Sequence, residues 1–202
     1  MSETLNRLAG IATATLGEAQ GLRGIVDHRI APLWRPIQLA GPAFTVQTPP
    51  GDNMPIHLAL AEAPPGSVLV VSCGGDESHA LIGDIMAQAA LKRGVAGLVT
   101  DGMVRDSRPV REMGFTVFCR GLQIRGPGKR SPGVRGQPVS LGGVVVRPGD
   151  YVLGDDDGLV IVRLEEAEAT LAAALAREEK ERGVMGQIAE GRTTAEIMGL
   201  KG

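Results

Sequence analysis

The fold prediction starts from residues 83–106, GDIMAQAALKRGVAGLVTDGMVRD, which contain one helix and one strand in succession. Good helix formers fill residues 85–92, Asp84 stands at the helix N-cap position, and Gly94 follows as a stop signal. Residues 97–100 are short and apolar, which indicates a strand. A helix of about ten residues and a strand of about five cover similar distances in opposite directions. We therefore expect the start of the helix and the end of the strand to lie at one edge of the domain.

That edge would gather Asp84, Arg105 and Asp106. A helix N-terminus and a guanidinium both attract anions, and carboxylate oxygens are ligands for divalent cations. Two carboxylates leave coordination positions open, so a substrate could join the metal. A 2-oxo acid would fit, with its carboxylate on Arg105 and the amides of Ile85 and Met86, and its keto oxygen on the metal. A metal in that place withdraws electrons and would promote retro-aldol cleavage or decarboxylation of a β-keto acid.

The segments before this stretch predict an α/β architecture. Residues 68–73, VLVVSC, are the most apolar run and are typical of a strand buried on both faces of a parallel sheet. A strand over 44–48 and a helix from about 54 to 62 come before it. Asp52 or Asn53 would cap that helix, whose N-terminus could also face an anion. The alternation of helices and strands favours one α/β layer with right-handed crossovers.

The segments after it add more strands and a long helix. The expected elements are strands at 116–119, 144–146, 151–153 and 159–162, and an alanine-rich helix at 164–182. The loop 123–137 is rich in Gly, Pro and cationic residues, and we interpret it as a solvated loop in preference to a phosphate or partner contact.

Three further patterns favour structural roles over functional ones. Thr15 and Glu18 have the spacing of a capping box, so a helix is expected to start there, with Glu18 as part of the cap. His57 has no second ligand at metal-binding spacing, so packing is its expected role. The aspartates at 155–157 lack the downstream glutamate of a calcium loop and predict a turn.

Composition narrows the classes of function. The chain has 202 residues, enough for one substantial domain, and a formal net charge of -2 with 2% aromatic residues, which gives no basis for nucleic-acid binding. Cys73 and Cys119 stand alone in apolar segments and are expected to be buried and reduced. The sequence has no signal-peptide pattern and no apolar run long enough for a membrane span, so the cytoplasm is the expected location.

Several short motifs resemble one known family. They are Gly51-Asp52-Asn53, Gly83-Asp84, Asp101-Gly102-x-x-Arg105-Asp106, Arg147-Pro148-Gly149-Asp150 and Asp157-Gly158. An aspartate, twenty intervening residues and then Arg-Asp is the most specific of these features. The pattern resembles the family of 4-hydroxy-4-methyl-2-oxoglutarate aldolases, which also includes the regulator of ribonuclease activity A. The likeness extends over nearly the whole chain.

The resemblance implies a fold and an assembly. The expected fold is a swivelling-domain-like α/β/α sandwich with a central sheet, in a single domain spanning residues 1–202. The family forms trimers, often paired into hexamers, with sites between subunits. A glutamate from the C-terminal helix of a neighbouring subunit would approach the metal. Glu181 is our choice for it, with Glu178 and Glu179 as alternatives.

The resemblance also implies site roles. Asp106 would bind Mg²⁺ or Mn²⁺ directly and Asp84 through water, while Arg105 would contact pyruvate and polarise its carbonyl. The amides of Ile85 and Met86 would hold the substrate carboxylate, and Asn53 would complete the substrate contacts. The predicted function is a lyase that yields pyruvate from a 4-hydroxy-2-oxo acid and decarboxylates oxaloacetate.

A non-catalytic regulator of a ribonuclease is the alternative within the same family. The regulator branch tends to replace the upstream aspartate and to carry an acid three positions after Arg-Asp. This chain keeps Asp84 and has Pro109 there, which favours the enzyme. Relatives often have Asp where this chain has Glu18, so the resemblance implies no role for Glu18. A methyltransferase is disfavoured because no glycine-rich loop follows the first strand.

Overall fold

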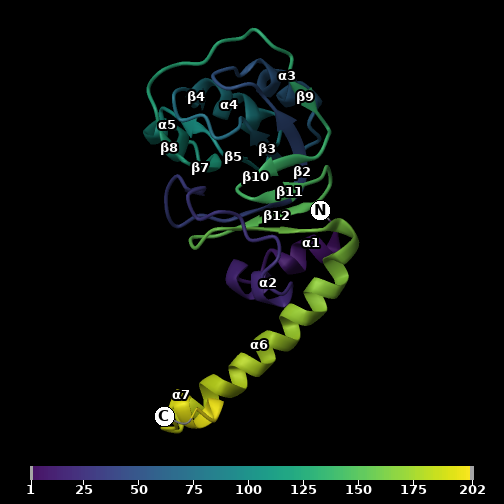
Figure 1. Ribbon diagram of the computed structural model, residues 1–202, viewed down its shortest axis with the longest axis vertical. Helices are drawn as coiled ribbons and strands as arrows, with labels where there is room; N and C mark the ends of the chain where they lie inside the picture. The colour runs from purple at the N-terminus through teal and green to yellow at the C-terminus, as the bar shows by residue number, and fades with distance from the viewer. Residues whose placement is uncertain (1, 201–202) are drawn as a thin grey trace.

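A curled central sheet forms the frame of the protein. The computed structural model describes residues 2–200, and its main sheet has the strand order β1-β7-β5-β3-β2-β12-β13, with β9 paired to β2 (Figure 1). The strands of this sheet are β1 (Ala31–Pro32), β2 (Leu39–Gln47), β3 (Val68–Ser72), β5 (Gly97–Thr100), β7 (Thr116–Cys119), β9 (Val134–Arg135), β12 (Tyr151–Gly154) and β13 (Leu159–Val162).

The middle of the sheet is parallel, as the sequence predicts. Strands β2, β3, β5 and β7 pair in parallel, and all five residues of β3 are buried. The connections between them contain α3 (Met54–Glu62), α4 (Asp84–Lys92) and α5 (Ser107–Glu112), which pack on one face of the sheet around a large hydrophobic cluster (Figure 1). The alternation of helices and parallel strands is therefore confirmed.

The rest of the sheet is covered by different elements. A hairpin of β10 (Val139–Leu141) and β11 (Val144–Val146) packs in a second hydrophobic cluster with β2, β3, β12 and β13. Helices α1 (Glu3–Leu8), α2 (Thr13–Ala19) and the start of α6 (Ala167–Ala189) form a third cluster with β12 and β13. The expected mixed α/β sandwich with a central sheet is confirmed.

A second, small sheet lies close to the first. It consists of β4 (Ala80–Ile82), β6 (Met103–Val104) and β8 (Gly121–Leu122), all parallel, in the order β4-β6-β8. The sequence did not predict these strands, because two or three residues are too few to show periodicity. This sheet determines which residues meet at the candidate site.

A helix starts close to Thr15, as expected, but two predicted helix caps are wrong. Gly83 is the N-cap of α4, with extended backbone angles, and Asp84 is the first helical residue. Helix α2 begins at Thr13 after the N-cap Ala12, so Thr15 and Glu18 lie inside the helix and form no capping box. Glu18 instead forms an ion pair with Arg177 of α6, a partner that is distant in sequence.

The C-terminal helix is longer than predicted and leaves the body of the protein. A short 3₁₀ turn, Leu164–Glu166, precedes α6, and α7 (Thr194–Met198) follows it. The last buried residue of α6 is Ala174, and no residue from 175 to 200 is buried. Figure 1 shows the second half of α6 and α7 projecting away from both sheets.

Both cysteines are buried and free, as predicted. Burial is the main cause that raises the pKa of Cys73 to about 12 and that of Cys119 to about 11, so neither thiol is a nucleophile at neutral pH. Among residues 2–200 no helix is both long enough and apolar enough to cross a membrane.

Asp101 ties the end of β5 to the loop after β3. Its buried carboxylate accepts hydrogen bonds from the Cys73 amide at 2.7 Å, the Gly75 amide at 3.1 Å and the Ser72 hydroxyl at 3.3 Å. These donors would lose their acceptor if the carboxylate were removed, and an unpaired buried donor is costly.

We therefore expect Asp101→Ala to lower the free energy of unfolding by about 2–3 kcal/mol, since it leaves buried donors unpaired. Asp157→Ala is the matched control, because Asp157 is exposed, and it should change stability by less than about 0.5 kcal/mol. Urea unfolding followed by circular dichroism measures both. Equal midpoints for the two variants would contradict the role of Asp101.

Candidate functional site

The pairing of β4 with β6 places the predicted site residues together. Ile82 faces Val104 in the parallel register, and the Arg105 amide donates to the Ile82 carbonyl at 3.0 Å. The residues that follow each strand, Gly83-Asp84 and Arg105-Asp106, therefore emerge side by side. The expected meeting of Asp84, Arg105 and Asp106 at one edge is confirmed.

The first turn of α4 offers one amide to a ligand. The first amides of a helix have no partner within the helix. Here the Asp84 amide donates to Asp106 Oδ2 at 3.4 Å, and the Ile85 amide donates to Asp84 Oδ1 at 2.7 Å. Of the two amides expected to bind a carboxylate, the Met86 amide is thus open to a ligand, whereas the Ile85 amide would first have to release Asp84.

Asp106 sits in a special backbone conformation. It is at the N-cap of α5 with φ 55° and ψ 38°, the left-handed region that residues with a Cβ adopt at a cost. Its Oδ2 lies 3.4 Å from Arg105 Nε. A Cβ built on Gly83 would lie only 2.2 Å from that same oxygen, so the absence of a side chain at residue 83 makes room for the carboxylate.

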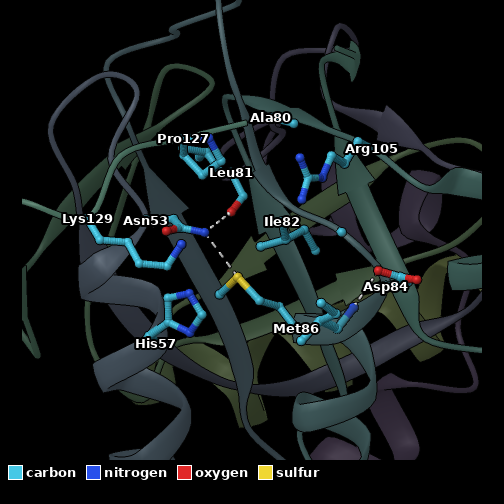
Figure 2. A pocket seen from close by; sticks show the side chains of 12 residues that line it. Asn53, His57, Ala80, Leu81, Ile82, Asp84, Met86, Arg105, Pro127 and Lys129 are labelled. Atoms are coloured by element: carbon cyan, nitrogen blue, oxygen red, sulfur yellow. Dashed lines mark hydrogen bonds between the residues drawn. The ribbon is translucent and has the colours of Figure 1, made fainter. Parts of the chain in front are cut away.

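A small pocket opens beside these residues. It contains about 100 Å³ of space and is lined by the start of α4, by Arg105, and by Asn53, His57 and Lys129 (Figure 2). Figure 2 shows Arg105 on one side of the pocket, with His57 and Lys129 across from it. This volume suits a small organic acid better than a nucleotide-sized ligand.

Asn53 contributes an acceptor to the pocket wall. It is 4% exposed, and its amide nitrogen donates to the Leu81 carbonyl at 2.8 Å and contacts Met86 Sδ at 3.2 Å. Because those bonds fix which end is the nitrogen, the opposite end is Oδ1, which has no hydrogen-bond partner among residues 2–200. A buried acceptor without a partner is unusual, and here Oδ1 is enclosed while the amide nitrogen holds Leu81 and Met86 in place.

The carboxylate of Asp52, the residue before Asn53, binds both the first turn of α3 and the loop 123–137. Its Oδ1 accepts from the Met54 amide at 2.9 Å, whereas the N-cap Asn53 makes no side-chain cap bond. Its Oδ2 accepts from the amides of Arg130 and Ser131 at 2.7 and 3.0 Å. Burial opposes ionisation of Asp52, but these amide hydrogen bonds outweigh it and hold the pKa below its usual range.

Two residues that line the pocket were given other roles in the sequence analysis. His57 was expected to be a packing residue, but it is exposed and lines the pocket. The loop 123–137 was expected to be merely solvated, yet Lys129 from this loop also lines the pocket. Although its surface is exposed, the His57 ring is partly desolvated by its neighbours; this, and next the nearby Lys129 charge, lower its pKa, so the imidazole is neutral at neutral pH.

Two carboxylates at the rim of the pocket are the candidate metal ligands. Among residues 2–200, no three His, Cys, Asp or Glu side chains gather in a way that could hold a metal ion. Asp84 and Asp106 nevertheless supply hard oxygen donors at a partly exposed rim, which suits Mg²⁺ or Mn²⁺ with most positions left to water, substrate or another chain. Glu181 is not near them: it lies on the projecting half of α6 and pairs with Arg177 at 2.8 Å.

Comparison with known proteins identifies the family. The family model for RraA-like proteins, described as Aldolase/RraA, matches residues 9–161. The chain belongs to the RraA-like family. A protein of Halalkalibacterium halodurans, provisionally named 4-hydroxy-4-methyl-2-oxoglutarate aldolase, is 39% identical over 165 residues, which cover 81% of this chain and 78% of that protein.

Two solved structures of similar sequence have the same fold as this chain. RraAS2 of Streptomyces coelicolor, described as an unusual member of the RNase ES inhibitor RraA protein family, superposes with a TM-score of 0.83 at 30% identity and covers 93% of this chain and 98% of that chain. An uncharacterised protein of Pseudomonas syringae pv. tomato superposes with a TM-score of 0.82 at 30% identity, with coverages of 96% and 92%. The family therefore includes both an aldolase-named relative and a ribonuclease-inhibitor relative of this chain.

The packing at Gly83 yields a direct test of the site. In Gly83→Ala the new Cβ would overlap Asp106 Oδ2 and lie 3.1 Å from Arg105 Nε, so the Asp106 carboxylate has to move. We expect a folded protein with at least about tenfold weaker Mn²⁺ binding, since displaced ligands lose metal affinity. Electron paramagnetic resonance of free Mn²⁺ measures the affinity.

Gly10→Ala serves as the control, because its Cβ would meet only the Arg7 carbonyl at an ordinary 3.5 Å. It should bind Mn²⁺ like the unmodified protein. Unchanged Mn²⁺ affinity in Gly83→Ala would show that Asp106 does not bind the metal.

Proposed function

We propose that this protein is a divalent-metal-dependent lyase that cleaves 4-hydroxy-4-methyl-2-oxoglutarate or a related 4-hydroxy-2-oxo acid to pyruvate, and that it also decarboxylates oxaloacetate. One observation carries the proposal: Arg105 and the start of α4 line one small pocket, and the Asp106 carboxylate lies next to them, 3.4 Å from both Arg105 Nε and the Asp84 amide. The aldolase-named relative at 39% identity supports the same reaction class.

The residues at this edge could divide the work as follows. The Met86 amide and the N-terminal end of α4 attract the carboxylate of the 2-oxo acid. Arg105 donates to the keto oxygen, where negative charge develops when the neighbouring carbon–carbon bond breaks, and so stabilises the transition state. Asn53 lines the pocket on the other side, where it would contact the substrate.

Asp106 and Asp84 are the residues of this chain that would hold Mg²⁺ or Mn²⁺. When bound, such an ion supplies Lewis acidity toward the oxygen on which charge develops. The left-handed backbone of Asp106 and the glycine before Asp84 fix the position of the carboxylates before any ion arrives.

The rest of the metal shell would come from a second copy of the chain. We propose a homotrimer, or a hexamer made of two, in which the projecting part of α6 presents Glu181 to the site of a neighbour, with Glu178 and Glu179 as alternatives. Two features support this. Among residues 2–200 no group of three possible metal ligands forms, although Asp84 and Asp106 lie at the rim, and the second half of α6 exposes Met185, at 67%, together with its acidic residues.

A protein-binding regulator remains the second candidate, because RraAS2 shares the fold over 98% of its length. A regulator needs no pocket chemistry. The convergence of Arg105, Asp84 and Asp106 on a pocket therefore favours the lyase.

A single assay distinguishes the two candidates. With Mn²⁺ present, we expect pyruvate release from oxaloacetate above the rate of metal alone, complete loss in EDTA, and recovery when metal is restored. Arg105→Lys should lower kcat/KM by about tenfold or more, because an ammonium cannot reproduce the planar guanidinium fork. Full activity in EDTA would remove the metal from the mechanism, and no turnover with fresh metal would favour the regulator.

Subunit mixing tests the shared site. Arg105→Lys and a variant with Glu178, Glu179 and Glu181 all changed to Gln should each be nearly inactive. After the two are mixed equally and their subunits exchange, about one quarter of the sites in a cyclic trimer should combine intact groups from two chains. Pyruvate release should therefore recover to about one quarter of the unmodified level, given a heterologous interface. No recovery despite proven exchange would place the complete site within one chain.

A further inference from the structure

A second hollow lies between α5 and the segment that follows β1. It contains about 520 Å³ of space and shares no lining residue with the pocket at Arg105. Its lining includes three arginines and the only tryptophan of the chain, which are Arg35, Arg108, Arg111 and Trp34. Both walls are tied to β7: β1 pairs with this strand, the Leu33 amide donates to the Val117 carbonyl at 2.9 Å, and α5 precedes β7 in the chain. The hollow is therefore a fixed feature of the fold.

The arginines give this hollow an excess of positive charge. One lining carboxylate, Glu112, accepts from Arg108 Nε at 3.1 Å. Arg35 Nε donates to the Asp156 carbonyl at 2.9 Å, while the Asp156 carboxylate accepts from a different backbone amide. Among residues 2–200, neither Arg35 nor Arg111 forms an ion pair. Three guanidinium groups thus share one concavity with a single carboxylate.

The positions of these arginines suit an anion with several oxygens. Arg108 and Arg111 are three positions apart on α5, so they lie on the same face of the helix. Arg35 belongs to the other wall, and its two terminal nitrogens have no hydrogen-bond partner within residues 2–200. Guanidinium groups bind phosphate oxygens through paired hydrogen bonds, and a phosphate would also relieve the repulsion among the three cations.

Trp34 adds an aromatic surface beside these charges. It is partly buried and packs against two of the hydrophobic clusters, so its ring is held in place. Aromatic rings and guanidinium planes both stack on nucleotide bases. The volume of the hollow falls within the range of ligand sites, about 300–1,000 Å³. The hollow therefore has room for a ligand that combines a flat ring with phosphate groups.

We propose that this hollow binds a nucleoside diphosphate, with its phosphate groups on the three arginines and its base against Trp34. The competing occupant is an acidic helix of a second copy of the chain. On a helix, side chains that share a face are about 5–6 Å apart, and acidic ones carry one charge each. A diphosphate concentrates more charge on two adjacent groups, which suits three guanidinium groups around one hollow, and its nucleoside supplies the flat ring. Such a site is independent of the lyase chemistry proposed above.

Trp34 reports directly on this site, because it is the only tryptophan. Titration with ADP, at low salt and with excitation beyond the absorption of adenine, should give a saturable change in its emission. EDTA in the buffer prevents binding of the phosphates through a metal at Asp106. Adenosine and pyrophosphate should each bind at least about tenfold more weakly, because each lacks one half of the contacts. No saturable change, or equal affinity for ADP and either fragment, would overturn the proposal.

Two arginine variants locate the effect. Arg111→Met should weaken ADP binding at least about tenfold, the effect of one charge-assisted contact. Arg7→Met is the matched control, because Arg7 is also an exposed arginine in the last turn of a six-residue helix and lies outside the hollow. It should bind ADP like the unmodified protein. Equal weakening in both variants would reveal a general charge effect and overturn the site.

Two other placements of the ligand have their own tests. Arg105→Met removes the guanidinium of the first pocket and should leave ADP affinity unchanged; loss of ADP binding would place the nucleotide in that pocket instead. Sedimentation velocity tests the helix of a second copy, and Arg111→Met should keep the oligomeric state of the unmodified protein. Dissociation of Arg111→Met with unchanged ADP affinity would assign the hollow to an interface between copies and overturn the proposal.

Discussion

The parallel pairing of β4 with β6 is the constraint on which the candidate site depends. Each strand ends at the pairing of Ile82 with Val104, and the next residue of each enters the site. A shift of register by one residue would turn Arg105 away from the pocket, because side chains alternate along a strand. Gly83 adds a second constraint, since the Asp106 carboxylate occupies the space that any Cβ would need. Main-chain geometry therefore positions the site before any side-chain contact forms.

The sequence correctly predicted that these residues meet, but it did not reveal the strand pairing that holds them together. Matching the length of a helix to that of the returning strand correctly brought Asp84 to Arg105 and Asp106. The residues are held together, however, by the short strands of the second sheet, which no periodicity reveals. Longer elements, such as β3 and α3, were predicted well because they span enough residues to show a pattern. The errors at Asp84 and Glu18 have a common cause: an acid at a cap and an acid within a first or last turn look alike in sequence.

The far side of the pocket could not be predicted from local patterns. Its formation depends on Asp52, which uses one oxygen to cap α3 and the other to bind the loop at Arg130 and Ser131. The sequence indicated the first task but not the second, since the two segments are distant along the chain. Once that contact folds the loop back over α3, His57 and Lys129 come to line one pocket, although each seemed unremarkable alone.

Exposed apolar side chains surround the charged rim of the candidate site. The rim next to Asp106 exposes Ile124, at 90%, and Leu122, at 56%, and the start of α4 exposes Ile85, at 75%. Apolar side chains gathered around a charged rim favour a covering partner, because their burial is favourable and the same cover excludes water. Exclusion of water would strengthen the attraction between Arg105 and a bound acid. The part of α6 after Ala174 extends roughly 20 Å at 1.5 Å per residue, and it buries no residue against its own chain beyond the ion pair of Arg177 with Glu18. An exposed apolar surface and a projecting helix, at different places on one chain, could pair as a heterologous interface, and such an interface forms a ring when its rotation closes.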